Sequence, residues 1–222
     1  MKKRCGYFTL TELLTVITIF CVIIGILMPV FSGSVNRAKL AFCGGNLRNI
    51  GQFVQYYCYD NAGMLPNIFP GMEQNSIPII RLPNNITLAL GRLMNNYVSS
   101  AYIFGCPDSP GHRGNDIEQL WQSSAMVWTA YLYRGQSSNY APRLNSPENF
   151  NRPYLMDFAC ITNQGEEFAP HNFEASNLLF ADGHTESRKN SKKTFEYFTA
   201  QAARHGEITP DCTILWQHAD LP

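Results

Sequence analysis

The chain has 222 residues, and its 17 basic and 17 acidic residues cancel at neutral pH. This balance argues against a nucleic-acid-binding surface, because such surfaces carry a marked excess of Lys and Arg. Aromatic residues make up 13% of the sequence, which is enough for a packed core and argues against intrinsic disorder. The length accommodates one membrane helix and one soluble domain of about 150 residues.

The N-terminal region contains an apolar run long enough to cross a bilayer. Basic residues occupy positions 2–4, and an almost purely apolar segment extends over residues 13–31. Residues 10–31 together match the roughly 20 residues that a transmembrane helix needs. Glu12, at the head of this run, is costly inside lipid, and such carboxylates are usually functional. The sequence therefore predicts a single-pass membrane protein.

The segment Phe8-Thr9-Leu10-Thr11-Glu12-Leu13-Leu14, with Pro29 further along, resembles the N-terminus of type IV pilins and type II secretion pseudopilins. The resemblance implies a leader peptide over residues 1–7, methylation of the new N-terminus, a cytoplasmic N-terminus and an exported head. The family places Gly directly before the Phe, whereas here Tyr7 intervenes and Gly6 lies one position earlier. A prepilin peptidase is therefore expected to cleave around Gly6, Tyr7 and Phe8, leaving Tyr7 or Phe8 first.

The helical pattern continues beyond the apolar run. Apolar residues recur at helical spacing from Val35 to Tyr57, and polar residues occupy the other faces. The sequence Asp60-Asn61-Ala62-Gly63 with the later Pro66 predicts the end of the helix. The first half of such a helix cannot be covered by its own domain, so it needs a bilayer or neighbouring helices.

The head is predicted to follow as an α+β domain. Its clearest element is a hairpin in which the two-residue turn Asp182-Gly183 joins strands over residues 177–181 and 184–187. Residues 64–85 show no periodicity and carry four prolines, and residues 135–153 read as a loop. Helices are predicted over 86–98, 115–122 and 193–205, and further strands over 102–104, 125–133, 154–161 and 213–216.

The predicted organisation is a leader over residues 1–7, a transmembrane helix over 8–31, an exported continuation of that helix over 32–63 and a head over 64–222. The fold class is α+β, with the long helix packed on a small antiparallel sheet. The resemblance to pilins implies the same arrangement.

Seven cysteines are present. Cys5 precedes the expected mature start and Cys21 lies in the apolar run. If Cys43 and Cys58 share one helix, they lie about 22 Å apart and cannot pair with each other. No CxxC or Cys/His zinc spacing appears, so most are expected to be buried apolar side chains, although an exported domain permits disulfides. The five outside the leader and the apolar run are Cys43, Cys58, Cys106, Cys160 and Cys212.

A second resemblance covers much of the head. Three segments are similar to a large bacterial family of prepilin-type proteins. The first is Cys43-Gly44-Gly45-Asn46-Leu47-Arg48-Asn49-Ile50-Gly51, and the second is Cys106-Pro107. The third is His171 followed by Asn177-Leu178-Leu179-Phe180-Ala181-Asp182-Gly183-His184. Members carry Cys-x-Asn-Asn-Leu-Lys-Gln-Ile-Gly, a midway Cys-Pro, and a His followed after nine residues by Asp-Gly; here the spacing is one residue longer. The resemblance implies that Cys106 forms a disulfide with Cys43 or packs against the helix near it.

Glu12 is the predicted assembly residue. In prepilin-like filaments the family glutamate is thought to neutralise the N-terminal amine of the adjoining subunit, and either charge left alone in a low-dielectric core is costly. The alternative is a glutamate that reaches the membrane interface of a plain signal anchor.

A metal site and an active site are the other two candidates. His171, Asp182 and His184 could bind a divalent cation, Zn²⁺ or Ca²⁺, because imidazole and carboxylate groups suit such ions. The preferred interpretation of Asp182-Gly183 is a turn instead of a metal site. Apart from this possible divalent cation, no cofactor is expected. No Gly-x-Ser-x-Gly, Ser-x-x-Lys or His-Glu-x-x-His motif is present, and Glu166-Glu167 reads as a solvated pair, so an enzyme is not expected.

The sequence thus predicts a structural or accessory subunit of a type II secretion pseudopilus or a type IV pilus-like filament. It would sit in the inner membrane with its head in the periplasm or outside the cell, and its partners would be other prepilin-like subunits, a prepilin peptidase and lipid. The alternative is a membrane-anchored binding module that does not polymerise and holds a glycan or surface polymer on Trp121, Trp128 and Tyr131. A metal-dependent hydrolase at His171 and His184 is a third hypothesis.

Overall fold

The structure is a computed structural model that describes residues 9–67, 76–109, 111–123, 125–134, 143–157, 159–161, 167–168, 171, 174–190, 196–198 and 219–220. The chain divides into two compact units, Met1–Ala38 and Lys39–Pro222. The boundary between them falls within the first helix, α1 (Leu10–Asp60). The fold class is α+β, as the sequence predicts.

Helix α1 is continuous from Leu10 to Asp60. It ends where the sequence predicts, because the chain turns back on the last helical turn: the Gly63 N–H donates to the Cys58 carbonyl at 2.7 Å. Ala62 and Gly63 both take positive φ, at 53° and 83°. A glycine just beyond a helix adopts this conformation at little cost, which explains the stop signal.

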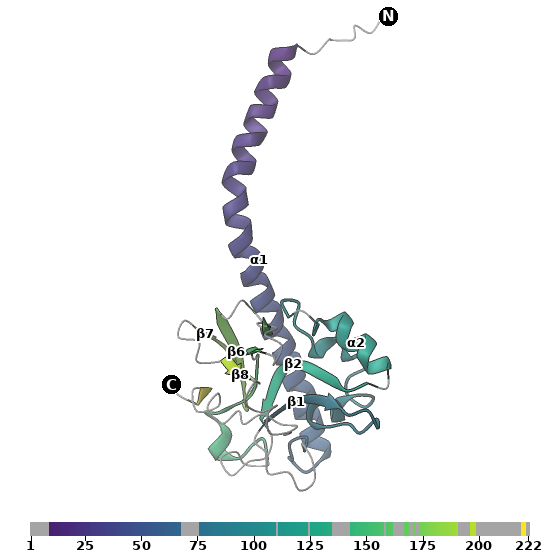
Figure 1. Ribbon diagram of the computed structural model, residues 1–222. Coiled ribbons are helices and arrows are strands. Elements are labelled where there is room, and N and C mark those ends of the chain that lie inside the picture. The colour runs from purple at the N-terminus through teal and green to yellow at the C-terminus, as the bar shows by residue number, and fades with distance from the viewer. Residues whose placement is uncertain are drawn as a thin grey trace, which may run out of the picture. The chain divides into compact units, whose positions relative to one another are not determined.

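Within the second unit, α1 buries one stripe of side chains. Cys43, Leu47, Ile50, Val54 and Cys58 recur every three or four residues, and all are buried. Figure 1 shows this part of α1 beside the strands of the head. Near Gly51 this helix faces Leu179 and Tyr154 of the main sheet, whereas Cys43 contacts Cys106 outside that sheet.

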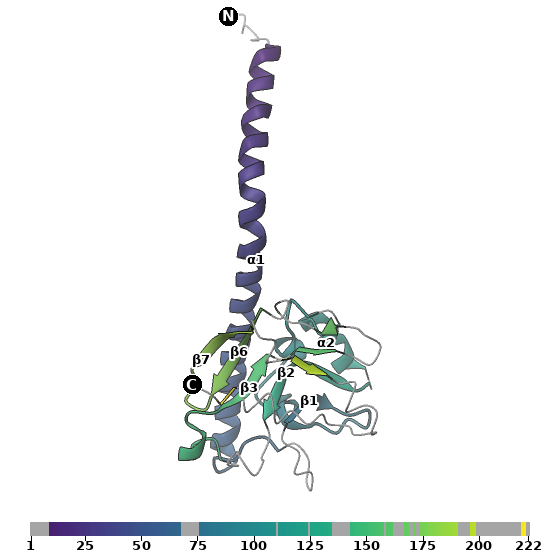
Figure 2. The ribbon, with the colours of Figure 1, turned by 60° about the vertical axis from the view of Figure 1, so that its left-hand side comes forward.

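The main sheet has five antiparallel strands in the order β1-β2-β3-β6-β7. Figure 2 shows its strands from a second side. A smaller sheet has the order β5-β4-β8, in which β4 and β8 are parallel. The main strands are β1 (Ser76–Arg81), β2 (Val127–Arg134), β3 (Pro153–Asp157), β6 (Ala175–Phe180) and β7 (Thr185–Lys189). The others are β4 (Ala159–Ile161), β5 (Glu167–Phe168) and β8 (Glu196–Phe198).

The predicted hairpin is confirmed as β6 and β7, which pair from Ala175↔Lys189 to Leu179↔Thr185. Its turn is one residue longer than predicted. The Gly183 N–H donates to the Phe180 carbonyl, and the Phe180 N–H donates to the His184 carbonyl. This is a three-residue turn ending in a glycine at φ 89°, the second most common way to close a hairpin.

Three predicted elements differ from the structure because their patterns are short. Residues 86–98 form only the 3₁₀-helix η1 (Ala89–Leu93), with positive φ at Asn85, Ala89 and Asn95. Residues 102–104 belong to a second 3₁₀-helix, η2 (Ala101–Phe104), instead of a strand. The predicted helix over 193–205 contains β8, which pairs with β4.

Two further predictions about strands differ from the structure. Strand β1 was missed because Pro78 interrupts it, and proline is tolerated there since β1 is the edge of the sheet. Residues 154–161 are two strands, β3 and β4, that belong to different sheets. The predictions of α2 (Gly114–Gln122) and β2 are confirmed. The predicted strand over residues 213–216 lies outside the described residues.

Gly51 sets the approach of α1 to the sheet. A Cβ at this position would lie 2.9 Å from Leu179 Cδ2 and 3.2 Å from the Tyr154 hydroxyl. Gly45, on the same helix, has nothing within 4 Å of its Cβ position. The two glycines are therefore a matched pair for testing this packing.

We predict that Gly45→Ala stabilises the head by about 1 kcal/mol, because alanine is the better helix former. Gly51→Ala should not stabilise the head, because overpacking a core costs about 1–3 kcal/mol and cancels the gain in helix propensity. Thermal unfolding of the full chain in detergent would show the difference. Equal gains from both substitutions would contradict close packing at Gly51.

Candidate functional site

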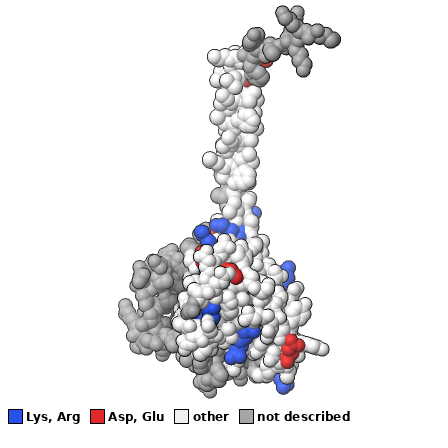
Figure 3. All heavy atoms as spheres, turned by 90° about the vertical axis from the view of Figure 1, so that its right-hand side faces the viewer, with Lys and Arg blue, Asp and Glu red and all other residues white. Residues whose placement is uncertain are grey.

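The first unit of the chain presents a bare apolar surface. Residues Leu10–Met28 have a mean hydropathy of 2.5, and none of their side chains is buried. No charged residue occurs between Glu12 and Arg37, and the surface of this stretch is correspondingly white in Figure 3. Within the described residues this is the one helix long and apolar enough to cross a membrane. It is consistent with a membrane anchor or a signal sequence.

Glu12 has a local partner at the start of α1. Its carboxylate accepts hydrogen bonds from the Thr9 backbone N–H at 2.9 Å and from the Thr9 hydroxyl at 2.7 Å. The Glu12 N–H donates in return to the Thr9 hydroxyl at 3.3 Å. This reciprocal arrangement is a capping box, which the spacing Thr-x-x-Glu could have indicated. Any role of Glu12 in assembly must therefore be separated from its role as a cap. The predicted processing residues Gly6, Tyr7 and Phe8 lie outside the described residues.

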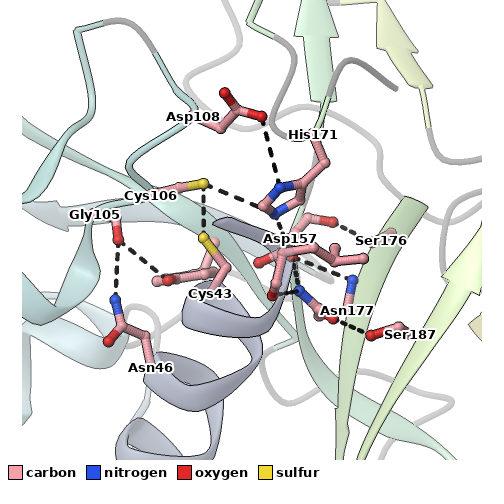
Figure 4. Close-up of polar contacts among 12 residues, drawn as sticks. Cys43, Asn46, Gly105, Cys106, Asp108, Asp157, His171, Ser176, Asn177 and Ser187 are labelled. Atoms are coloured by element: carbon pink, nitrogen blue, oxygen red, sulfur yellow. Dashed lines mark hydrogen bonds and ion pairs between the residues drawn. The ribbon is translucent and has the colours of Figure 1, made fainter. Parts of the chain in front are cut away.

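The second unit contains a buried cluster of two cysteines and a histidine. The Cys43 thiol on α1 donates to the Cys106 sulfur at 2.8 Å, and both are free cysteines here. The Cys106 sulfur lies 3.9 Å from His171 Nε2. One ligand-type atom from each of the three lies within 4.8 Å of the others, and all three residues are buried. Figure 4 shows them converging from three separate segments.

Asp157, the last residue of β3, completes the cluster. One of its carboxylate oxygens, Oδ2, lies 3.2 Å from His171 Nε2 and accepts bonds from the Asn177 side chain at 2.6 Å and the Asn177 N–H at 3.2 Å. Asn177 also donates to the Leu40 carbonyl at 3.0 Å and accepts from the Ser187 hydroxyl. The cluster is thereby tied to α1, β3, β6 and β7.

The opposite side of His171 faces a second carboxylate. His171 Nδ1 lies 3.8 Å from Asp108 Oδ2, and Lys39 Nζ lies 2.6 Å from Asp108 Oδ1. Among the described residues, the buried atoms His171 Nδ1, Asp108 Oδ2 and Asp157 Oδ1 have no hydrogen-bond partner. His171 itself takes a φ of 58°, which is uncommon outside glycine and fixes how its ring enters the core.

The cluster shifts the protonation of its members in different directions. The hydrogen bond from Cys43, helped by His171, lowers the pKa of Cys106 to about 7 against the effect of burial. The Cys43 thiol, which donates that bond and is also buried, has a raised pKa. Burial disfavours the charged form of His171, but Asp157 and Cys106 together raise its pKa to about 10. The arrangement favours a protonated imidazole beside a sulfur with thiolate character.

The predicted ligand set of His171, Asp182 and His184 is not brought together. Asp182 and His184 lie on the exposed turn, where Asp182 accepts from the His184 N–H at 3.0 Å and His184 stacks on Phe180 with ring centroids 4.2 Å apart. His171 instead joins the cysteines. The hairpin geometry explains the separation, because its turn residues face solvent while His171 faces the core.

The predicted aromatic binding surface is also not exposed as expected. Tyr131 is fully buried, and its hydroxyl donates to the Gly105 carbonyl at 3.2 Å. Trp121 and Trp128 are partly buried against the core. The Arg81 guanidinium lies 4.8 Å from the centre of the Trp121 ring and donates to carbonyls at the end of α2. These side chains hold the head together.

Comparisons with known proteins add no relative: no protein-family model, no curated protein and no solved structure matches the chain.

The sequence did not point to Asp108, Asp157 or Asn177 as members of a site. Asp108 follows the Cys106-Pro107 pair closely, and Asn177 lies within the segment before Asp182-Gly183. Their positions in those segments were the only available signal. No sequence signal indicated Asp157, because an acidic residue at the end of a strand is common.

We predict that Asn177→Ala lowers the free energy of unfolding by about 2 kcal/mol or more, because Asp157 loses a charge-assisted hydrogen bond in the core. Asn46→Ala is the matched control, since Asn46 donates to the neutral Gly105 carbonyl at 3.3 Å. It should cost about 1 kcal/mol. Chemical unfolding of the two variants in detergent would test this. Equal losses would contradict an anchoring role for Asn177.

Proposed function

We propose that the chain is a structural or accessory subunit of a type II secretion pseudopilus or a type IV pilus-like filament. The observation that carries this proposal is the fully uncovered apolar segment Leu10–Met28 at the start of a helix that continues into the head. Apolar surface on this scale is unfavourable in water, so the segment needs lipid or other helices around it. The resemblance of residues 8–14 and Pro29 to prepilins selects filament assembly among membrane-anchored roles.

In the proposed mechanism the chain acts by helix packing and performs no catalysis. The apolar segment first lies in the inner membrane, with the N-terminus in the cytoplasm and the head exported. A prepilin peptidase removes the leader, and the bare helix then exchanges lipid for the helices of neighbouring prepilin-like subunits. The Glu12 carboxylate pairs with the new N-terminal amine of the adjoining subunit and thereby sets the register, because either charge left alone in a low-dielectric core is costly.

The mature N-terminus gives the first test. Mass spectrometry of the protein isolated from membranes should find Tyr7 or Phe8 as the first residue, with a methylated amine. Gly6 supplies the small residue before the cut, and the spacing of Glu12 and Pro29 favours Phe8. A mature chain beginning near Ser34 or Val35 would identify an ordinary signal peptide and refute the proposal.

Two substitutions at Glu12 separate charge pairing from helix capping. Glu12→Gln keeps a side chain that can accept from the Thr9 N–H, whereas Glu12→Ala removes both the cap and the charge. Both variants should still insert, because each makes the segment less charged. If charge pairing drives assembly, both should reduce crosslinking to neighbours by about tenfold or more, since an unpaired buried charge costs several kcal/mol.

The measurement uses a photo-crosslinking residue in place of Phe20, an exposed side chain of the apolar segment. Thr18→Ala is the control, because the Thr18 hydroxyl donates to the Thr15 carbonyl of its own helix at 2.8 Å. It should crosslink like the parent chain. Normal crosslinking by Glu12→Gln with loss in Glu12→Ala would reduce Glu12 to a cap. The absence of any crosslinked neighbour in the parent chain would favour a non-polymerising anchor.

A further inference from the structure

The buried cluster gathers the atoms of a metal site. Two sulfurs and one imidazole nitrogen come from Cys43, Cys106 and His171, whose ligand atoms lie within 4.8 Å of one another. A carboxylate oxygen of Asp157 lies 3.2 Å from the same imidazole nitrogen. Zinc is bound by these atom types, almost always four at a time and in a tetrahedron when the site is structural. Cys43 lies on α1, Cys106 follows η2, Asp157 ends β3 and His171 lies between β5 and β6. Figure 4 shows the contacts that link Cys43 to Cys106, Cys106 to His171 and His171 to Asp157.

The distances from His171 Nε2 to the Cys106 sulfur and to the Asp157 carboxylate are close to those between ligands of a zinc tetrahedron. Its sulfur–nitrogen and nitrogen–oxygen edges are about 3.5 Å and 3.4 Å, given zinc–ligand bonds of about 2.0–2.3 Å. The corresponding separations here are 3.9 Å for Cys106 Sγ to His171 Nε2 and 3.2 Å for His171 Nε2 to Asp157 Oδ2. The sulfurs lie 2.8 Å apart and would separate to about 3.8 Å by small side-chain rotations.

The surroundings also fit a metal-bound histidine. Such a histidine usually donates its second ring N–H to a carboxylate, which fixes the tautomer that leaves the other nitrogen free to bind. His171 Nδ1 faces Asp108 Oδ2 at 3.8 Å, and neither atom has a hydrogen-bond partner in the part of the chain that the structure describes. Lys39 Nζ contacts the other oxygen of Asp108. Asn177 donates to Asp157 Oδ2 at 2.6 Å, and the buried Oδ1 has no hydrogen-bond partner within the described ranges.

A disulfide alone does not account for these neighbours. A Cys43–Cys106 disulfide is uncharged and apolar, so it gains little from a buried imidazole and carboxylate beside it. Burying polar groups without full hydrogen bonding costs free energy. A cation at the centre would offset the negative charge of the buried Asp157 carboxylate, whose Oδ2 lies 3.2 Å from His171 Nε2, and would bind both sulfurs in the reduced state.

We propose that Cys43, Cys106, His171 and Asp157 form a structural zinc site. Two protons pass to solvent when the ion binds, one from the Cys43 thiol and one from the protonated His171 ring, which leaves two thiolates and a neutral imidazole that binds through Nε2. All four ligands come from the protein and are buried, so the site has no open position for a substrate and its role is to hold α1 on the sheet. This inference does not depend on the proposed function.

The test is the metal content of the full chain, extracted from membranes into detergent without chelator or reductant. Inductively coupled plasma mass spectrometry should find about one zinc per chain, as expected for one tetrahedral site. Cys43→Ser and Cys106→Ser should lose it. Cys58→Ser is the matched control, because Cys58 is a buried cysteine on the same helix outside the cluster, and it should keep the ion. Asp108→Asn should weaken zinc retention against a competing chelator by about tenfold, as expected for a residue that orients a ligand.

A second measurement on the unmodified chain keeps the test valid if the cysteine variants do not fold. The chain is denatured with a chelator and no reductant, alkylated, and digested for mass spectrometry. Alkylation of both Cys43 and Cys106, together with stoichiometric zinc before denaturation, supports the site. Cysteines that alkylate only after reduction, or free cysteines in a chain that holds no zinc, would overturn it.

Discussion

The structure depends on how the surface of one helix is covered. From Cys43 to Cys58, α1 buries an apolar stripe against the head, and Gly51 lets it approach Leu179 and Tyr154. From Leu10 to Met28 the same helix has an apolar surface that none of the described residues buries. Apolar area is stable only when it is removed from water. The second half of α1 therefore specifies the fold of the head, and the first half specifies the environment in which the protein can exist.

The sequence predicted the fold best where patterns are long or chemically distinctive. The end of α1 at Asp60 and the hairpin around Asp182-Gly183 followed from glycines that favour positive φ, and both are confirmed. Predictions for short segments were wrong because the structure of those segments depends on residues that are distant in the sequence. Residues 101–104 curl into η2, and β8 forms by pairing with β4, which no local pattern could indicate.

The buried cluster could not be derived from spacing, because its members are brought together only by the fold. Cys43 and Cys106 are 63 positions apart, and Cys106 and His171 are 65 apart. A search for closely spaced zinc ligands misses such a set, and pairing His171 with Asp182 through the hairpin selected the wrong neighbours. In space His171 lies between Asp157 and Asp108, while Asn177 ties the group to the Leu40 carbonyl on α1. The same contacts that position the cluster also fasten α1 to the sheet.

We propose that lipid or neighbouring helices cover the first half of α1 and that the head lies outside the cytoplasm. The most direct test is the fate of the full chain in cells, measured by alkaline carbonate extraction of membranes and by protease added to intact spheroplasts. The account predicts that the chain remains in the membrane pellet and that the added protease digests the head. Recovery of the uncleaved chain in the soluble fraction, or a head that protease reaches only after the membrane is broken, would contradict it.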